Sequence, residues 1–122
     1  ISTYMVGGAA SELWMQGTAR FEATGLSSES LFLGRAFERY GVDAEFEQRY
    51  EYKNAVNQFT ESDFTPAHRE ATVAWMTSIH SSAIANIARD RRMQPAGLTT
   101  ALEGGPYSAE QALSLKLIDK VG

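Results

Sequence analysis

The feature that most constrains the fold is a long run, from Pro66 to about Arg92, in which apolar residues recur at three- and four-residue spacing. That spacing places them on one face of a helix. Thr65 can accept a hydrogen bond from a free amide of the first turn, and Pro66 suits the first helical position. We therefore predict one long helix that ends before Gln94-Pro95. Its apolar face comprises Val73, Met76, His80, Ala83, Ile84 and Ile87.

Shorter elements are predicted on both sides of this helix. Ser28 can cap a helix that Gly41 ends, and alternation of apolar and charged residues after Gly41 is typical of a strand. Ser108 and Gln111 have the residue types of a capping box. The expected elements are a helix at 2–10, short strands at 13–15 and 20–23 around Gly17, a helix at 29–40, a strand at 42–49 and a helix from 108 to 115.

The composition is that of an ordinary globular chain, with 43% hydrophobic and 21% charged residues and a net charge of −4. An acidic pI near 5.1 provides no general surface for neutralising phosphates, so we expect no nucleic-acid partner. The cationic cluster at 89–92 is expected to be a solvated helix end, where positive charges complement the helix dipole.

The chain contains no cysteine, which excludes disulfides, thiolate ligands and a thiol nucleophile. Its two histidines, His68 and His80, do not form a recognised zinc-binding spacing. We expect no metal and no cofactor, with His80 in the core or at an interface and His68 exposed. No segment reaches the roughly 18 consecutive apolar residues of a membrane span. Because Ile1 is not an initiator methionine, we expect a piece of a longer protein.

The most specific motif lies between Tyr52 and Glu70. It keeps the register of a pattern in which a Tyr-Lys-Ser-Ala-Val-Glu-Pro-Phe-like segment precedes an acidic turn and a Ser-Pro-Glu-Ala-Arg-Glu-like helix start. The matching residues are Tyr52-Lys53, Ala55-Val56, Phe59, Asp63, Pro66-Ala67 and Arg69-Glu70. This pattern closely resembles the signal peptide peptidase family of bacterial serine proteases, the protease IV-like peptidases of family S49. In that family the lysine activates a serine nucleophile as the general base, so the resemblance implies this role for Lys53.

Both ends of the chain also follow the family pattern. Tyr4–Trp14 resembles the helix after the nucleophile, and Ala112–Gly122 resembles the Ala-Leu-x-Leu-Gly-Leu-Val-Asp-x-Ile-Gly ending. The same register places the family's serine at Ile1, so the nucleophile is missing. Ser2 lies one position after the expected serine. Because consecutive helix residues point about 100° apart, Ser2 is a poor substitute without a shift in register. A second family serine, which can help hold the lysine, falls at Leu26.

Residue chemistry alone leaves two environments open for Lys53. Continued strand alternation places it on a solvated face. Catalysis instead requires a neutral amine, and near pH 7 an unperturbed lysine is neutral in fewer than about one molecule in a thousand. Desolvation would lower its pKa, whereas a close Glu51 would stabilise the ammonium. The residues that could desolvate it are Tyr50, Tyr52, Ala55, Val56 and Phe59.

The resemblance implies an α/β fold of the ClpP/crotonase type, helix-rich with short strands. Residues 1–122 would form a single partial domain, the second half of the lysine-bearing copy. The implied enzyme is a Ser-Lys endopeptidase that degrades cleaved signal peptides and other hydrophobic peptides, with its serine supplied from outside this segment. It would act as a homo-oligomer at the bacterial cytoplasmic membrane, facing the periplasm, attached through parts outside the segment. The isolated segment is expected to be inactive.

Two alternatives remain open at this stage. The first is a non-catalytic scaffold or peptide-binding half-domain, which the apolar residues Ile1 and Leu26 favour and the retained Lys53 opposes. The second is an acyl-CoA enzyme on the related fold, which the peptidase-like context of Lys53 opposes.

Overall fold

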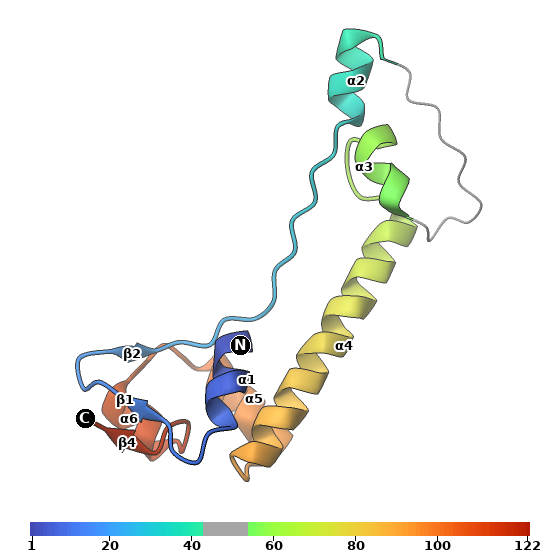
Figure 1. The fold of residues 1–122 in the computed structure, drawn as a ribbon. Helices are drawn as coiled ribbons and strands as arrows, with labels where there is room; N and C mark the ends of the chain where they lie inside the picture. The colour runs from blue at the N-terminus through green and yellow to red at the C-terminus, as the bar shows by residue number, and fades with distance from the viewer. Residues whose placement is uncertain (43–53) are drawn as a thin grey trace. The chain divides into compact units, whose positions relative to one another are not determined.

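The computed structural model describes residues 1–42 and 54–122. Within them the chain is helix-rich with short strands, as predicted. The elements are α1 (Ser2–Gly8), β1 (Trp14–Met15), β2 (Arg20–Phe21), α2 (Gly34–Tyr40), the 3-10 helix η1 (Asn54–Val56), α3 (Asn57–Thr60), α4 (Pro66–Asp90), α5 (Pro95–Glu103), β3 (Tyr107–Ser108), α6 (Ala109–Ser114) and β4 (Lys120–Val121) (Figure 1). Beyond Val42, the strand expected at 42–49 lies outside the described residues.

The chain divides into two compact units. The first, which we call the terminal unit, contains Ile1–Leu26 and Ser78–Gly122. The second, which we call the middle unit, contains Ser27–Thr77. The boundary falls within α4, so each unit includes one part of the long helix.

The long helix predicted from Pro66 to about Arg92 is confirmed as α4. Its cap is also confirmed, because the hydroxyl of Thr65 accepts a hydrogen bond from the amide of His68 at 3.2 Å. Ile84 and Ile87 are buried, whereas the side chain of Val73 is 57% exposed. The predicted apolar face is therefore covered only in part among the described residues.

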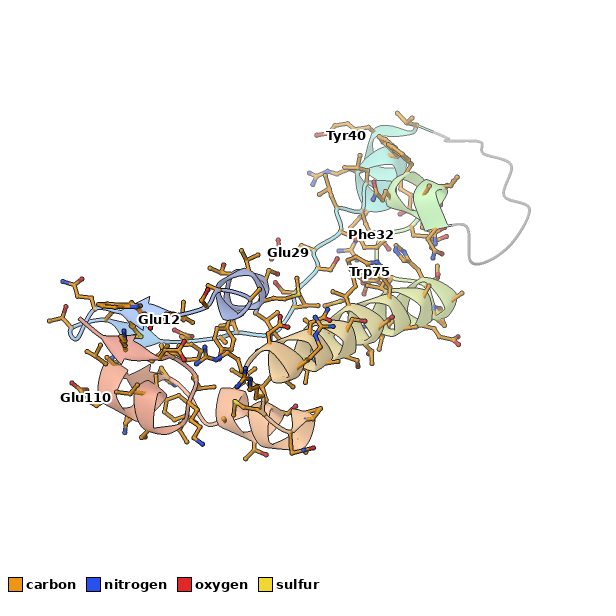
Figure 2. All side chains as sticks on the ribbon, turned by 60° about the horizontal axis from the view of Figure 1, so that its bottom comes forward. Glu12, Glu29, Phe32, Tyr40, Trp75 and Glu110 are labelled. Carbon is orange, nitrogen blue, oxygen red and sulfur yellow. The ribbon has the colours of Figure 1, made fainter. Side chains whose placement is uncertain are left out.

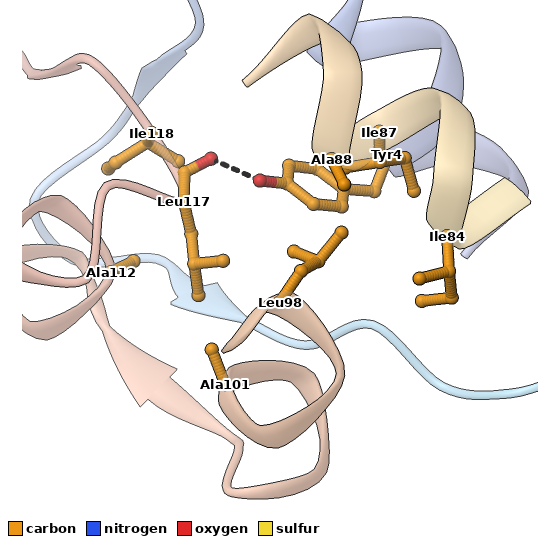
Figure 3. Packing of buried hydrophobic residues seen from close by; sticks show 9 residues of the cluster. All are labelled: Tyr4, Ile84, Ile87, Ala88, Leu98, Ala101, Ala112, Leu117 and Ile118. Atoms are coloured by element: carbon orange, nitrogen blue, oxygen red, sulfur yellow. Dashed lines mark hydrogen bonds between the residues drawn. The ribbon is translucent and has the colours of Figure 1, made fainter. Parts of the chain in front are cut away.

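The core of the terminal unit surrounds the C-terminal part of α4. Ile87, Leu98 and Leu117 are fully buried, and Tyr4 of α1 donates its hydroxyl proton to the carbonyl of Leu117 at 2.7 Å (Figure 3). Each large apolar side chain removed from water contributes roughly 1.5–3 kcal/mol. Burial in this cluster therefore joins α1, α4, α5 and the C-terminal segment. Its members are Tyr4, Ile84, Ile87, Ala88, Leu98, Ala101, Ala112, Leu117 and Ile118.

Two short strand pairs hold the ends of the terminal unit together. β1 and β4 are parallel, with Trp14 opposite Lys120, and β2 and β3 are antiparallel, with Phe21 opposite Tyr107. The two strands predicted around Gly17 are thus confirmed, each with a partner from the C-terminal part of the chain. The capping box that precedes α6 is confirmed as well, because Ser108 and Gln111 exchange hydrogen bonds.

The solvated helix end predicted at 89–92 is confirmed for Arg89 and Arg92, which are exposed, but not for Arg91. The side chain of Arg91 is only 7% exposed, and its two terminal nitrogens lie 2.6 and 3.1 Å from the carboxylate oxygens of Asp119. This hydrogen-bonded pair holds the pKa of Asp119 below its ordinary value. Asp119 also accepts the amide hydrogen of Leu13 at 2.8 Å. Arg91 therefore fastens the C-terminal segment to α4, while Arg89 remains exposed.

In the middle unit, the helix expected at 29–40 begins five residues later, at Gly34. The amide of Leu33 donates to the carbonyl of Gln58 at 2.6 Å, and the amide of Gly34 donates to Glu61 at 3.1 Å. These partners satisfy amides that the start of a helix leaves free, so no cap from Ser28 is needed. The C-terminal end was predicted correctly, because Gly41 adopts a left-handed conformation with φ 67°.

We expect Gly34→Ala to lower the free energy of unfolding by at least about 1–3 kcal/mol, the usual cost of overpacking. A Cβ at Gly34 would lie 2.6 Å from the carbonyl carbon and oxygen of Glu61, which are backbone atoms. The matched control is Gly97→Ala in α5, where a Cβ meets nothing within 4 Å. Since alanine favours a helix over glycine by about 1 kcal/mol, the control is expected to be neutral or stabilising. Urea unfolding measures the change in the free energy of unfolding for both variants. Equal changes would contradict the close contact between Gly34 and the backbone of Glu61.

Burial raises the pKa of the Tyr4 hydroxyl to about 12, and the nearby positive charge of Arg91 opposes this shift. The phenol is neutral in both states below about pH 10, so its contribution to stability is complete there. Between pH 10 and about 12 the phenol of Tyr4 ionises in the unfolded chain before it does so in the folded chain. The contribution of Tyr4 to the free energy of unfolding is therefore lost as the pH rises through this range.

We expect Tyr4→Phe to cost about 1 kcal/mol near neutral pH, through loss of its hydrogen bond, and to reduce the alkaline loss of stability. Chemical unfolding across this pH range measures both effects. Tyr40→Phe is the control, because Tyr40 is 79% exposed. An alkaline loss of equal size in the Tyr4→Phe variant and the wild type would show that Tyr4 is not its source.

Candidate active site

The predicted catalytic residue, Lys53, lies outside the described residues, which resume at Asn54. The next residues form η1 and α3. Asn57, the first residue of α3, is only 3% exposed. Its side-chain nitrogen donates to the side-chain oxygen of Asn54 at 3.2 Å and to the hydroxyl of Thr65 at 3.4 Å. One buried amide therefore joins the side chain of Asn54 to the residue that caps α4.

Helix α2 contacts this segment from another direction. In addition to the two backbone hydrogen bonds from Leu33 and Gly34, the rings of Phe37 and Phe59 stack at 6.5 Å between centroids. Backbone hydrogen bonds fix position more narrowly than apolar contact does, because they depend strongly on distance and angle. α3 is thus held both by α2 and by the beginning of α4.

The sequence predicted an exposed His68, but the structure places it, half-buried, within an aromatic group. Its ring lies 4.7 Å from that of Phe64 and 5.9 Å from that of Phe32. Phe32 is labelled among the side chains in Figure 2. The Nδ1 atom of His68 is buried and has no hydrogen-bond partner. Two other aromatic residues of the same unit, Tyr40 and Trp75, lie at its surface and are 79% and 57% exposed.

In the terminal unit, the structure brings together three positions that the sequence singled out. Ile1, Ser2 and Leu26 line one pocket of about 270 Å³, which we call the α1 pocket. The backbone nitrogen of Ile1 donates to the carbonyl of Thr24 at 3.0 Å, which links the start of α1 to the segment before Leu26. The full lining is Ile1, Ser2, Met5, Leu26, Ser78, Ile79, Ser82, Ala83 and Asn86.

The α1 pocket contains hydroxyls but lacks a base to activate them. Ser2, Ser78 and Ser82 line it, and none of the described residues in its lining is an acid, a lysine, an arginine or a histidine. A serine hydroxyl is a weak nucleophile until a neighbouring base accepts its proton. The apolar side chains of Ile1 and Leu26 occupy the two positions at which the family resemblance expects serines. The described lining alone cannot perform nucleophilic catalysis.

A second pocket, of about 400 Å³, also borders Ile1. Its lining includes Glu22, Glu103 and His80. His80, which the sequence predicted in the core or at an interface, is half-buried. Within the part of the chain that the structure describes, no group of three or more acidic or histidine side chains has the geometry of a metal site.

Comparison with known proteins shows the class to which this arrangement belongs. The sequence pattern of peptidase family S49 matches residues 2–122. The chain therefore belongs to peptidase family S49.

A curated relative is Protease 4 of Salmonella typhi, which is 23% identical over 124 residues. The alignment covers 95% of this chain and 20% of that protein, so the chain spans about a fifth of the length of its relative. The family resemblance inferred from the sequence is thus confirmed. In the described ranges, no helix is long and apolar enough to cross a bilayer.

Sequence reasoning gave no role to Asn57 or to the pairing of Arg91 with Asp119. For Asn57 a weak local signal exists, because Asn54 and Asn57 are three residues apart and can meet on one side of a helical turn. For Arg91 no local signal exists, since Asp119 lies 28 residues further along the chain.

Proposed function

We propose that this chain is the lysine-bearing part of a serine endopeptidase, in which Lys53 is the general base and the serine comes from outside residues 1–122. The observation that carries the proposal is family membership over almost the whole chain, together with Tyr52-Lys53 in its family register. The α1 pocket supports the second half of the proposal. Its residues at the two expected serine positions, Ile1 and Leu26, bear no hydroxyl.

In the proposed reaction, the neutral amine of Lys53 accepts the proton of the serine hydroxyl as the oxygen attacks a peptide carbonyl. The resulting ammonium returns that proton to the leaving amine, and an acyl-enzyme ester remains. Water then attacks the ester while the amine of Lys53 accepts a proton from it, and the ammonium returns that proton to the serine oxygen as the ester bond breaks, which restores the free serine and the neutral amine and releases the carboxylic acid. This cycle requires a lysine pKa well below its ordinary value, which burial beside apolar residues would produce.

The proposed substrates are cleaved signal peptides and other hydrophobic peptides, as the family resemblance implies. The proposed setting is a homo-oligomer at the bacterial cytoplasmic membrane, facing the periplasm and attached through parts of the protein outside this segment. Residues 1–122 would form the second half of one ClpP/crotonase-like domain. The match to only a fifth of Protease 4 is consistent with a chain that is one part of a longer peptidase.

A non-catalytic scaffold is the second candidate. It is favoured by one observation, the apolar side chains of Ile1 and Leu26 in the α1 pocket. A scaffold and a lysine-bearing peptidase differ in what they require of Lys53, so substitution of that residue separates them.

We expect Lys53→Ala in the full-length protein to lower kcat on a hydrophobic signal-peptide-like substrate by about 100- to 10,000-fold, the usual contribution of a general base. Lys53→Arg should be equally impaired, because it keeps the positive charge but cannot release its proton. A lysine on a solvated face would tolerate arginine. Lys120→Ala is the matched control, since its side chain is 48% exposed and pairs with Glu12 at the surface. Full turnover in both Lys53 variants would contradict the proposed role.

We also expect the isolated 122-residue chain to hydrolyse no peptide, since the lining of the α1 pocket provides no base for Ser2. The measurement is release of a fluorescent product from the same substrate, with Ser2→Ala and Ser11→Ala compared at equal concentration. Ser11 is an exposed serine outside the α1 pocket. Activity that disappears in Ser2→Ala but persists in Ser11→Ala would make Ser2 the nucleophile and contradict the family register.

A further inference from the structure

Two residues in the described part of the chain hold a left-handed backbone conformation without being glycine. Arg92 has φ 53° and lies shortly after the end of α4, and Lys116 has φ 60° and lies shortly after the end of α6. Glycine is the usual residue at such a position, because a side chain there costs conformational energy. The family ending that this segment resembles has glycine where this chain has Lys116. Outliers of this kind are concentrated at binding and catalytic sites.

Both outliers line one pocket of about 590 Å³, which we call the basic pocket. It belongs to the terminal unit, and its lining includes residues at the ends of α4 and α6. The charged residues of the lining are the cations Arg91, Arg92 and Lys116 and the carboxylates Asp90 and Asp119. The attraction of the basic pocket for an anion therefore depends on which of these charges are already paired.

The two carboxylates of the basic pocket are each paired with an arginine. The oxygens of Asp119 lie 2.6 and 3.1 Å from the terminal nitrogens of Arg91. Asp90 accepts a hydrogen bond from Nε of Arg89 at 3.2 Å. Each pair carries no net charge, so the remaining cations decide the charge of the pocket.

The side chains of Arg92 and Lys116 supply that remaining charge. In the part of the chain that the structure describes, neither side chain makes a hydrogen bond or an ion pair. Neither is needed to cap its helix, because backbone amides bond the last carbonyls. At the end of α4 the amide of Met93 donates to the carbonyl of Ala88 at 2.8 Å, and α6 ends in the same way. The two cations are therefore available to a ligand.

The backbone of Lys116 is fixed to the end of α4. Its carbonyl oxygen accepts hydrogen bonds from Nε and from one terminal nitrogen of Arg91, at 3.4 and 3.0 Å. The side chain of Arg91 is only 7% exposed. Because Arg91 directly precedes Arg92, this buried side chain links the two turns that carry the free cations. A site whose groups are held in place before binding spends less free energy on ordering them.

We propose that the basic pocket binds a phosphate monoester, held by the side chains of Arg92 and Lys116. Such a group carries about −1.5 to −2 charges at pH 7, which matches two uncompensated cations, whereas a carboxylate would balance only one. The guanidinium of Arg92 can donate two parallel hydrogen bonds to phosphate oxygens, and the ammonium of Lys116 can approach a third oxygen. The proposal goes beyond the peptidase activity proposed above and does not depend on it.

Two sources can supply a phosphate monoester, a soluble phosphate ester and the headgroup of an anionic phospholipid. Leu113 also lines the basic pocket, and its side chain is 39% exposed. An apolar side chain beside the phosphate would be removed from water by the acyl chain of a lipid, but not by a small soluble ester. Comparison of the two ligands therefore identifies the source.

The test is isothermal titration calorimetry of the full-length protein in a neutral detergent at low salt. The ligands are sn-glycerol 3-phosphate and dihexanoyl phosphatidic acid, two phosphate monoesters of which the second adds short acyl chains. Dihexanoyl phosphatidylcholine, which has no net charge, is the ligand control. Thermal unfolding of every variant is measured beside binding.

The variants are Arg92→Gly, Lys116→Gly and the double variant. Glycine removes the cation and adopts the left-handed turn without strain, so we expect these proteins to unfold at a temperature no lower than that of the wild type. The matched control is Lys120→Ala, which removes an exposed cation of the same unit from outside the lining of the basic pocket.

We expect the wild type to bind both monoesters and each single glycine variant to bind them about tenfold or more weakly, the usual scale for a hydrogen bond to a charged group. The double variant should show no measurable binding, and Lys120→Ala should stay within about twofold of the wild type. Added salt should weaken binding by the wild type, because charge holds the ligand. Tighter binding of phosphatidic acid than of glycerol phosphate would support a lipid headgroup, and the reverse order a soluble ester.

Three outcomes overturn the proposal. The first is a wild type that binds neither monoester. The second is a double glycine variant that binds as the wild type does, and a lower unfolding temperature in that variant would then assign the two cations to the fold. The third is an equal loss of affinity in Lys120→Ala and Arg92→Gly, which would show attraction to overall charge without a site.

Discussion

The terminal unit depends on burial of the C-terminal part of α4. Ile87 loses all contact with water, and Leu98 and Leu117 close over the same region from later parts of the chain. The cluster also includes Tyr4 from the N-terminal part of the chain, so it fixes α1 as well, and the hydroxyl of Tyr4 donates to the carbonyl of Leu117. The hydrogen-bonded pair of Arg91 and Asp119 then holds the C-terminal segment against the end of α4. The α1 pocket exists because α1 and α4 are held in this way.

The middle unit depends on backbone contact of a different kind. The close approach of Gly34 to Glu61 allows two backbone hydrogen bonds between α2 and the segment that follows Lys53. The buried amide of Asn57 adds the connection to Thr65. In this unit polar and backbone hydrogen bonds act beside aromatic contacts, whereas a larger cluster of buried apolar side chains holds the terminal unit.

Features encoded by neighbouring residues could be predicted from the sequence. Thr65-Pro66 gave the start of α4, and Ser108 with Gln111 gave the start of α6, because capping depends on residues one turn apart. The pairing of Trp14 with Lys120, and the burial of Arg91 against Asp119, could not be predicted because their partners are distant in the sequence. The predicted start of α2 was wrong for the same reason, since the free amides at the true start donate to the carbonyls of Gln58 and Glu61 instead of to a local cap.

For the candidate site, the family motif identified Lys53 and exposed the departures at Ile1 and Leu26. The motif did not indicate that Ile1, Ser2 and Leu26 line one pocket, because their proximity depends on how α1 and α4 pack. Nor did it indicate that the side chain of Asn57 is buried and hydrogen-bonded. The structure therefore adds the surroundings of the motif, while the assignment of Lys53 as the base still rests on the resemblance.

The central claim is that this chain supplies the base and another part of the protein supplies the serine. Its most direct test is to label the full-length protein with a fluorophosphonate probe and to identify the modified serine by mass spectrometry. The account predicts one labelled serine outside residues 1–122, with labelling lost in a folded Lys53→Ala variant. A label on Ser2, or on any other serine of this segment, would contradict the claim.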